Sequence, residues 1–170
     1  MSNIRIFVSH RIDIDSETVD TPVYFPVRCG AVYDEEGNSE IQGDDTGDNI
    51  SKLRMSFCEF TVQYWAWKNV DADYYGLCHY RRYLSFSDKR YKNTVFNMVR
   101  ELKLTPHEKK KYHLDDTKKI EKTVKQYDMI IPVVAKASEM SYNRQKTPFF
   151  KLHISLYTFE IRFNHSAYHA

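Results

Sequence analysis

Two short apolar runs, separated by a long helical segment, constrain the fold of this chain most strongly. Residues Ile4 to Ser9 are largely β-branched or aromatic and predict a buried strand. From Phe57 to Lys68, bulky residues recur at the 3.6-residue spacing of an amphipathic helix that ends near Asn69. Tyr74 to Cys78 is a second short apolar run and predicts another strand. Strand, helix and strand in this order predict an α/β sheet of mostly parallel strands flanked by helices.

The rest of the chain carries weaker signals. Pro22 and Pro26 predict an extended segment from Thr21 to Arg28, because each proline disfavours helix in the residue before it. A loop is expected between Asp34 and Asp48, where turn signals occur at Glu36–Asn38 and Thr46–Asp48. Further helices are expected over Tyr91–Leu104, from Pro106 onward and over Asp115–Gln126, and a last strand over Tyr127–Val134.

Composition excludes several classes of protein. A chain of 170 residues with 42% hydrophobic residues is sufficient for one compact domain. Its formal net charge of +2 does not indicate nucleic acid or a membrane surface as partner. No run approaches the roughly 20 apolar residues of a membrane span, so any membrane association would be peripheral. Three widely spaced cysteines, with no signal-peptide pattern, predict reduced thiols and a cytoplasmic location: Cys29, Cys58 and Cys78.

An acidic segment, Gly43 to Asn49, is the first candidate site. It contains Asp44, Asp45 and Asp48 together with two glycines. Such a segment could bind a metal or accept hydrogen bonds from sugar and ribose hydroxyls, although the spacing is not that of a calcium loop. On residue chemistry alone, a solvent-exposed turn that caps the following helix is the simpler explanation.

The second candidate is His79–Tyr80–Arg81–Arg82–Tyr83, which directly follows a predicted strand. In open α/β sheets ligands bind at the carboxyl ends of the strands, so these side chains are expected at the ligand edge. Adjacent arginines on an extended chain point to opposite faces, so one of the two could face a ligand. The planar guanidinium matches phosphate oxygens, which makes a diphosphate the natural ligand. Surface salt bridges to the acidic segment are the alternative.

The predicted helix between these two segments is rich in aromatic residues. Tyr64, Trp65 and Trp67 are expected to pack in the core, as aromatics at helical spacing usually do. Glu59 lies among them and would need a partner if it were partly buried.

Three motifs, in this order, resemble a bacterial family encoded in capsular and exopolysaccharide gene clusters. They are Gly43–Ser51, then Cys58–Glu59 with Tyr64–Asn69, then Tyr75–Leu77 with His79–Tyr83. The first strand, Pro26 and the segment Tyr127–Pro132 are also similar, so the resemblance extends from about Ile4 to Val134. The family was first described as a domain of unknown function and is grouped with glycosyltransferases of the GT-A type.

The resemblance implies a GT-A-like sheet that binds a nucleotide-sugar donor of UDP type. In GT-A enzymes, two aspartates after a strand hold a divalent metal against the donor diphosphate, and His79–Tyr83 occupies that place here. We therefore expect His79, Arg81 and Arg82 to be the catalytic residues, with an arginine neutralising the leaving diphosphate and no metal required. The aspartates could still hold a metal. The expected donor-binding residues are His10, Asp44, Asp45, Asp48, Asn49 and Tyr80.

The sequence departs from the family after Pro132. The resemblance implies a longer continuation, and the acceptor site would lie in it. We expect residues 1–134 to form the donor-binding domain and residues 135–170 a divergent or truncated tail that leaves the sheet incomplete. Alternating residues from Leu152 to Phe163 could form a genuine strand, or the tail could be an altered end produced by a frameshift.

These expectations lead to two functions. The first is transfer of a sugar to a growing or lipid-linked glycan in capsule, exopolysaccharide or O-antigen synthesis. The alternative is a non-catalytic nucleotide-sugar-binding remnant or subunit that needs a partner chain. A nucleic-acid binder is disfavoured, because the basic residues lack the signature of a nucleic-acid-binding fold.

Overall fold

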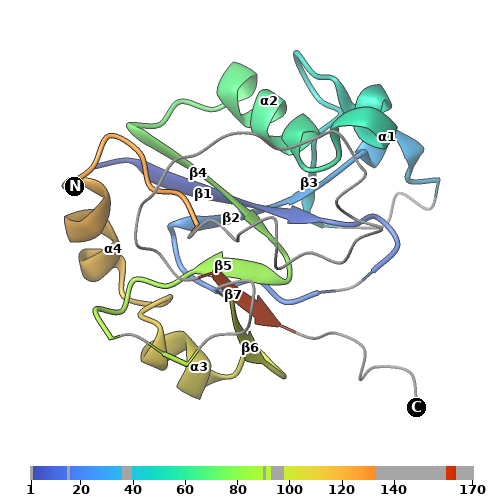
Figure 1. Cartoon of the computed structure of the whole chain (residues 1–170). Helices are drawn as coiled ribbons and strands as arrows, with labels where there is room; N and C mark the ends of the chain where they lie inside the picture. The colour runs from blue at the N-terminus through green and yellow to red at the C-terminus, as the bar shows by residue number, and fades with distance from the viewer. Residues whose placement is uncertain are drawn as a thin grey trace, which may run out of the picture. The chain divides into compact units, whose positions relative to one another are not determined.

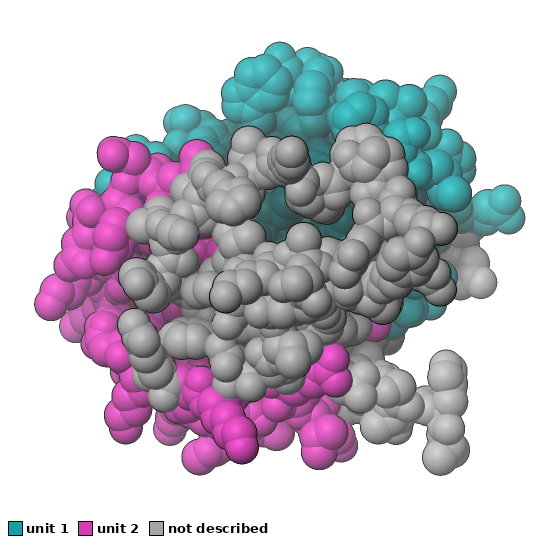
Figure 2. All heavy atoms as spheres, viewed as in Figure 1, with its two compact units in different colours: residues 1–80 teal, residues 81–170 magenta. Residues whose placement is uncertain are grey.

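The chain divides into two compact units, residues 1–80 (unit 1) and residues 81–170 (unit 2), shown in different colours in Figure 2. The computed structural model describes residues 2–14, 16–35, 40–89, 91–92 and 98–132, and the backbone of residues 160–163. The boundary predicted at Val134 lies outside the described residues and stays a prediction.

Unit 1 is built around a sheet of four parallel strands in the order β3-β2-β1-β4 (Figure 1). The central strand β1 pairs with β2 from Ile6 opposite Tyr24 and with β4 from Ile4 opposite Tyr74. The predicted α/β fold with mostly parallel strands is therefore confirmed. The elements of unit 1 are β1 (Ile4–His10), β2 (Tyr24–Arg28), η1 (Ala31–Tyr33), β3 (Gln42–Gly43), η2 (Ser51–Leu53), α1 (Arg54–Phe57), α2 (Phe60–Asn69) and β4 (Tyr74–His79).

The main core of unit 1 lies where α2 packs on the sheet. Phe7 on β1 makes edge-on ring contacts with Phe25 and with Trp65 of α2, at centroid distances of 5.9 and 6.3 Å. Burying each large apolar side chain contributes about 1.5–3 kcal/mol, so this contact fixes α2 against the strands. The buried members of the cluster are Phe7, Val27, Cys29, Val62, Trp65 and Ala66.

The aromatic pattern predicted where α2 ends, but it did not predict which of its residues are buried. The helix ends at Asn69, as expected, but its buried residues are Thr61, Val62, Trp65 and Ala66. Trp65 packs in the core as predicted, whereas Trp67 is 64% exposed and Tyr64 is half-buried. The single predicted helix is also interrupted at Cys58. This residue has a φ of 47°, which is not a helical backbone conformation, and it ends α1 before α2 begins.

Unit 2 contains a second group of strands and two helices. Strand β7 pairs antiparallel with β5 and parallel with β6. The elements are β5 (Arg82–Leu84), β6 (Met98–Glu101), α3 (Pro106–Lys111), α4 (Thr117–Val124) and β7 (Glu160–Phe163). The helices at Pro106 and within Asp115–Gln126 are confirmed. Of the tail segment that could form a strand, Glu160–Phe163 is strand β7, and residues 152–159 lie outside the described residues.

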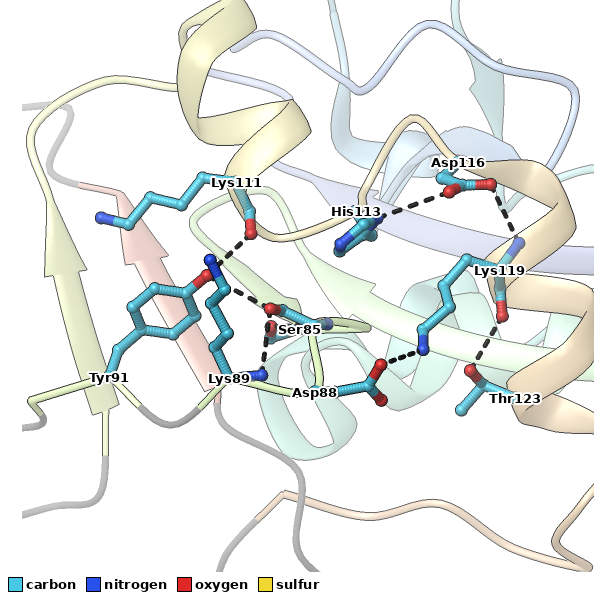
Figure 3. A network of polar contacts seen from close by, with 10 residues as sticks. Ser85, Asp88, Lys89, Tyr91, Lys111, His113, Asp116, Lys119 and Thr123 are labelled. Carbon is cyan, nitrogen blue, oxygen red and sulfur yellow. Dashed lines mark hydrogen bonds and ion pairs between the residues drawn. The ribbon is translucent and has the colours of Figure 1, made fainter.

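A polar network holds the loop after β5 against the two helices of unit 2 (Figure 3). The Tyr91 hydroxyl donates to the Lys111 carbonyl at 2.9 Å. The Lys119 ammonium donates to the Asp88 carboxylate at 2.5 Å, and its backbone N–H donates to Asp116 at 2.9 Å. The Lys111 ammonium in turn donates to Glu101 of β6 at 2.7 Å. These contacts connect β6, α3 and α4 within one unit.

Two sequence predictions in unit 2 are wrong. Met98–Glu101, inside the predicted helix Tyr91–Leu104, is strand β6 because it pairs with β7. Residues 127–132, inside the predicted last strand, have no regular secondary structure, and residues 133–134 lie outside the described residues.

Candidate functional site

The strand order of unit 1 identifies the place where a ligand would bind. From β1 the chain continues to β2 and β3 on one side, and then crosses to β4 on the other side of β1. Ligands of open α/β sheets bind outside the carboxyl ends of the two strands that flank such a reversal. In this chain those strands are β1 and β4, which end at His10 and His79.

His10 is the last residue of β1 rather than the first residue beyond it, and its side chain is only 2% exposed. Its Nε2 lies 2.6 Å from the Thr18 hydroxyl, and its Nδ1 lies 2.6 Å from the Ser16 hydroxyl. Both ring nitrogens are thus held by the loop that follows β1. The predicted contact of His10 with the nucleotide stays a prediction.

His79 and Tyr80 emerge at the reversal point, as predicted for the end of β4. The Tyr80 N–H donates to the Ser9 carbonyl at 3.0 Å, and its ring lies 6.2 Å from the His10 ring. The His79 imidazole Nε2 is 3.4 Å from Glu59 Oε1, which gives Glu59 the partner that its position required. The rings of His10, His79 and Tyr80 are thus neighbours at the ends of β1 and β4.

Arg11 and Asp13 follow β1 and lie at the same edge. Two nitrogens of the Arg11 guanidinium donate to the two carboxylate oxygens of Asp13. This pairing lowers the pKa of Asp13, with a smaller contribution from Arg54. The pKa of Arg11 is raised, chiefly by Asp13 and also by its interaction with Tyr80. Arg11 therefore connects the polar groups at the ends of β1 and β4.

Asp44 is a structural carboxylate at the end of β3, with none of its surface exposed. Its oxygens accept hydrogen bonds from the backbone N–H groups of Gly30 and Ala31, both at 2.9 Å. They also accept from the hydroxyls of Ser51 and Thr61, both at 2.6 Å. Because four donors occupy the carboxylate, a ligand would reach Asp44 only by displacing them. Its predicted donor contact stays untested.

The other acidic residues lie farther along the loop. Asp48 is bonded to α2: its carboxylate accepts from the Tyr64 hydroxyl at 3.1 Å, and its N–H donates to the Asn69 side chain at 3.1 Å. Asn69 ends α2 and precedes the amino end of β4, so Asp48 lies beside the C-terminal half of that helix rather than at the reversal point. The structure thus separates Asp48 from His10 and Tyr80, while Asp45 is exposed.

Asn49 closes the acidic loop. Its amide nitrogen donates to the carbonyls of Asp45 and Gly47, both at 3.0 Å, and its amide oxygen accepts from the Ser51 N–H at 3.2 Å. Gly47 has the positive φ of 57° that this tight loop requires. These contacts close the segment into a turn before η2, as the simpler explanation predicted, but Asp44 within it is buried rather than solvent-exposed. A role of Asn49 in donor binding stays a prediction.

The two arginines of the basic motif belong to unit 2. Arg81 lies in the turn before β5 and is half-buried, whereas Arg82 begins β5 and is exposed. Their side chains therefore differ in exposure. Because Arg81 lies in a turn rather than on the strand, the prediction that the two arginines point to opposite faces of an extended chain is not tested and stays a prediction. The unit boundary falls between Tyr80 and Arg81, so the motif is divided between the units.

Sequence reasoning missed the groups that organise the end of β2. Gly30 has a φ of 71°, and a methyl group at this position would overlap the side chain of Arg54. Arg54 begins α1 and reaches back over the strand end. No sequence motif around Cys29–Gly30–Ala31 singles out Gly30. No sequence motif singles out Arg54 either.

Two negative findings apply to the described part of the chain. No group of three or more histidine, cysteine, aspartate or glutamate side chains within it is arranged to hold a metal ion. No helix within it is long and apolar enough to cross a membrane.

The parallel sheet and the polar side chains at its reversal point define the class: an α/β protein with a ligand edge at the carboxyl ends of β1 and β4. Residues 5–160 match the model of a family described as a domain of unknown function, DUF4422, and the chain belongs to this family. The match continues to residue 160, so similarity to the family does not stop at Val134 as the sequence analysis predicted.

One solved structure is similar to this chain. The chain is similar to WbbM, a bifunctional glycosyltransferase solved in its apo form, with 34% sequence identity and a TM-score of 0.59. The similarity covers 66% of this chain and 20% of the WbbM chain, so this chain spans about one fifth of that relative's length. No curated protein matches significantly.

Proposed function

We propose that the chain is the nucleotide-sugar-binding part of a glycosyltransferase that passes a sugar to a growing or lipid-linked glycan. The observation that carries the proposal is the arrangement at the reversal point: His10, Arg11 and Tyr80 meet at the ends of β1 and β4. The 34% identity to a glycosyltransferase supports the same function.

The chemistry required at such a site is neutralisation of a leaving nucleoside diphosphate. Guanidinium groups can supply it, because they carry a permanent charge and offer paired N–H donors to phosphate oxygens. In this proposal His79, Arg81 and Arg82 keep the catalytic roles expected from the sequence, and one of the two arginines stabilises the leaving group. His10 and Tyr80 shape the nucleotide side of the site, and Asp45 and Asn49 are left to bind hydroxyls. A divalent metal held by aspartates is the alternative that the experiment includes.

The test is isothermal titration of the purified chain with UDP, GDP and ADP, each with and without Mn²⁺ or Mg²⁺. We expect binding of a nucleoside diphosphate, UDP above the others, without a requirement for metal. Hydrolysis or transfer from the matching nucleotide sugar would establish an enzyme, and binding without turnover would establish a binding module. Absence of diphosphate binding, combined with salt-sensitive RNA binding, would contradict both.

Substitution of the motif arginines tests their role directly. Arg81→Ala or Arg82→Ala should weaken UDP binding by about 10- to 100-fold, because a charge-assisted hydrogen bond is lost. Lysine at either position should restore only part of the affinity, since it cannot form the bidentate contact. Arg5→Ala, at the amino end of β1 and therefore away from the ligand edge, is the matched control. Equal UDP affinity in the wild type and both alanine variants would refute the assignment.

A further inference from the structure

Arg54 is a second cation at the ligand edge of unit 1, and the fold makes room for it. Its side chain passes over the residue that follows the end of β2 by two positions, Gly30. A methyl group on Gly30 would lie 2.9 Å from Arg54 Cγ and 3.0 Å from its Cβ, closer than carbon atoms pack. The absence of a side chain at Gly30 is therefore what allows Arg54 to lie across this strand end.

The charge of Arg54 is not neutralised within the described part of the chain. Asp13 is close enough for Arg54 to lower its pKa, but both Asp13 oxygens are engaged by Arg11. The Asp44 carboxylate beside Gly30 already accepts hydrogen bonds from four other donors. Among the side chains that the structure describes, Arg54 has neither an ion pair nor a hydrogen bond. A half-buried guanidinium with unused donors is a site for an anion.

Arg54 also continues a row of polar groups along the sheet edge. Tyr80, which follows β4, interacts electrostatically with Arg11, and Arg11 forms an ion pair with Asp13. Asp13 also interacts electrostatically with Arg54, which lies near the end of β2. The row thus crosses the carboxyl ends of three neighbouring strands, β4, β1 and β2. It contains two guanidinium groups, Arg11 and Arg54, and one carboxylate, Asp13, so its net positive charge suits a ligand with two adjacent phosphates.

We propose that Arg54 binds the diphosphate of the donor together with Arg11. This inference rests on the proposed function and adds to it a phosphate contact made by unit 1 itself. It also assigns a purpose to Gly30, whose backbone conformation and lack of a side chain both serve the placement of Arg54.

A competing role for Arg54 is purely structural. A guanidinium near the buried Asp44 could offset part of the free energy lost when that carboxylate leaves water. In that case removal of Arg54 would lower the stability of the fold and leave ligand affinity unchanged in the molecules that remain folded. Measuring stability and affinity on the same variants separates the two roles.

The experiment titrates UDP into the wild type, Arg54→Ala, Arg54→Lys and the control Arg5→Ala, with a thermal unfolding curve for each. We expect about 10- to 100-fold weaker UDP binding for Arg54→Ala, an intermediate value for Arg54→Lys and no change for Arg5→Ala. Log affinity should also fall less steeply with log salt concentration in Arg54→Ala, because one phosphate contact is missing.

Wild-type affinity in Arg54→Ala, whether or not its melting temperature falls, would overturn the inference. If Arg54→Ala does not fold, the lysine variant decides: unchanged UDP affinity there would count against a bidentate phosphate contact. Failure of the wild type to bind any nucleoside diphosphate is a different result, which would contradict the proposed function itself.

Discussion

At the scale of single residues, Asp44 shows how a motif that looks like a binding site can hold the fold together. Its carboxylate joins three separate segments, since it accepts from residues of η1, η2 and α2. Burial of a carboxylate is unfavourable unless its oxygens are hydrogen-bonded, and here two backbone and two hydroxyl donors satisfy them. The end of β3 is therefore fixed by one side chain.

Replacement of Asp44 by alanine should be strongly destabilising. Each buried donor left without a partner costs about 1–3 kcal/mol, so we expect the free energy of unfolding to fall by about 3 kcal/mol or more. Asp45→Ala, at the exposed neighbouring position, should change it by less than about 0.5 kcal/mol. Urea denaturation at neutral pH measures both. Similar losses in the two variants would show that the hydrogen bonds of Asp44 contribute little.

The sequence predicted the candidate site only in part, and the reason is physical. Residues at strand ends, such as His79 and Tyr80, were predictable because a strand pattern determines which edge its last residues reach. The burial of Asp44 was not, because it depends on donors from Gly30, Ser51 and Thr61, which meet only when the sheet forms. The role proposed for Arg54 follows from the absence of a partner among the side chains that the structure describes, and a sequence cannot show that absence.

At the scale of secondary-structure elements, the predictions that succeeded rest on local chemistry. Pro106 at the first turn of α3 and Asp116 at the start of α4 are strong helix-start signals, and both helices are present. The strand β6 was mistaken for helix because its partner, β7, lies some 60 residues later in the chain. The break at Cys58 was missed because a positive φ outside glycine has no sequence signal.

The start of α4 provides a stability test. The Asp116 carboxylate accepts from the Lys119 N–H at 2.9 Å, and this bond is the first cause of the lowered pKa of Asp116. Asp116→Ala should lower the free energy of unfolding by about 1 kcal/mol, whereas asparagine should keep most of the cap. The adjacent exposed residue provides the control variant Asp115→Ala. A melting temperature of Asp116→Ala equal to that of the control would contradict the capping role.

At the scale of the whole molecule, acid stability should be set by carboxylates in both units. Asp13, Asp88 and Asp116 all have lowered pKa values. Burial would raise the pKa of Glu101, but the Lys111 ammonium and the Tyr112 hydroxyl outweigh it and lower the value. A carboxylate with a lowered pKa in the fold stabilises it above the ordinary pKa, and this contribution is lost as the pH falls through the lowered value.

We therefore expect a free energy of unfolding that is nearly constant from about pH 7 to pH 5 and then falls. The decline should begin near the ordinary values of 4.5 for glutamate and 3.8 for aspartate. Urea denaturation at a series of pH values measures it. Glu101→Gln should make the free energy of unfolding fall less steeply with decreasing pH, because glutamine does not titrate and glutamate does. Stability unchanged down to pH 3 would contradict these assignments.

The parallel pairing of β1 has a kinetic consequence during synthesis of the chain. Ile4 lies opposite Tyr74, so the central strand of unit 1 obtains its second neighbour only after 70 further residues have been made. At about 5–20 residues per second, the ribosome needs roughly 4–14 s for that stretch. During this time one edge of an apolar strand stays open to other chains. Early chaperone binding to this strand should thus raise the yield of folded protein.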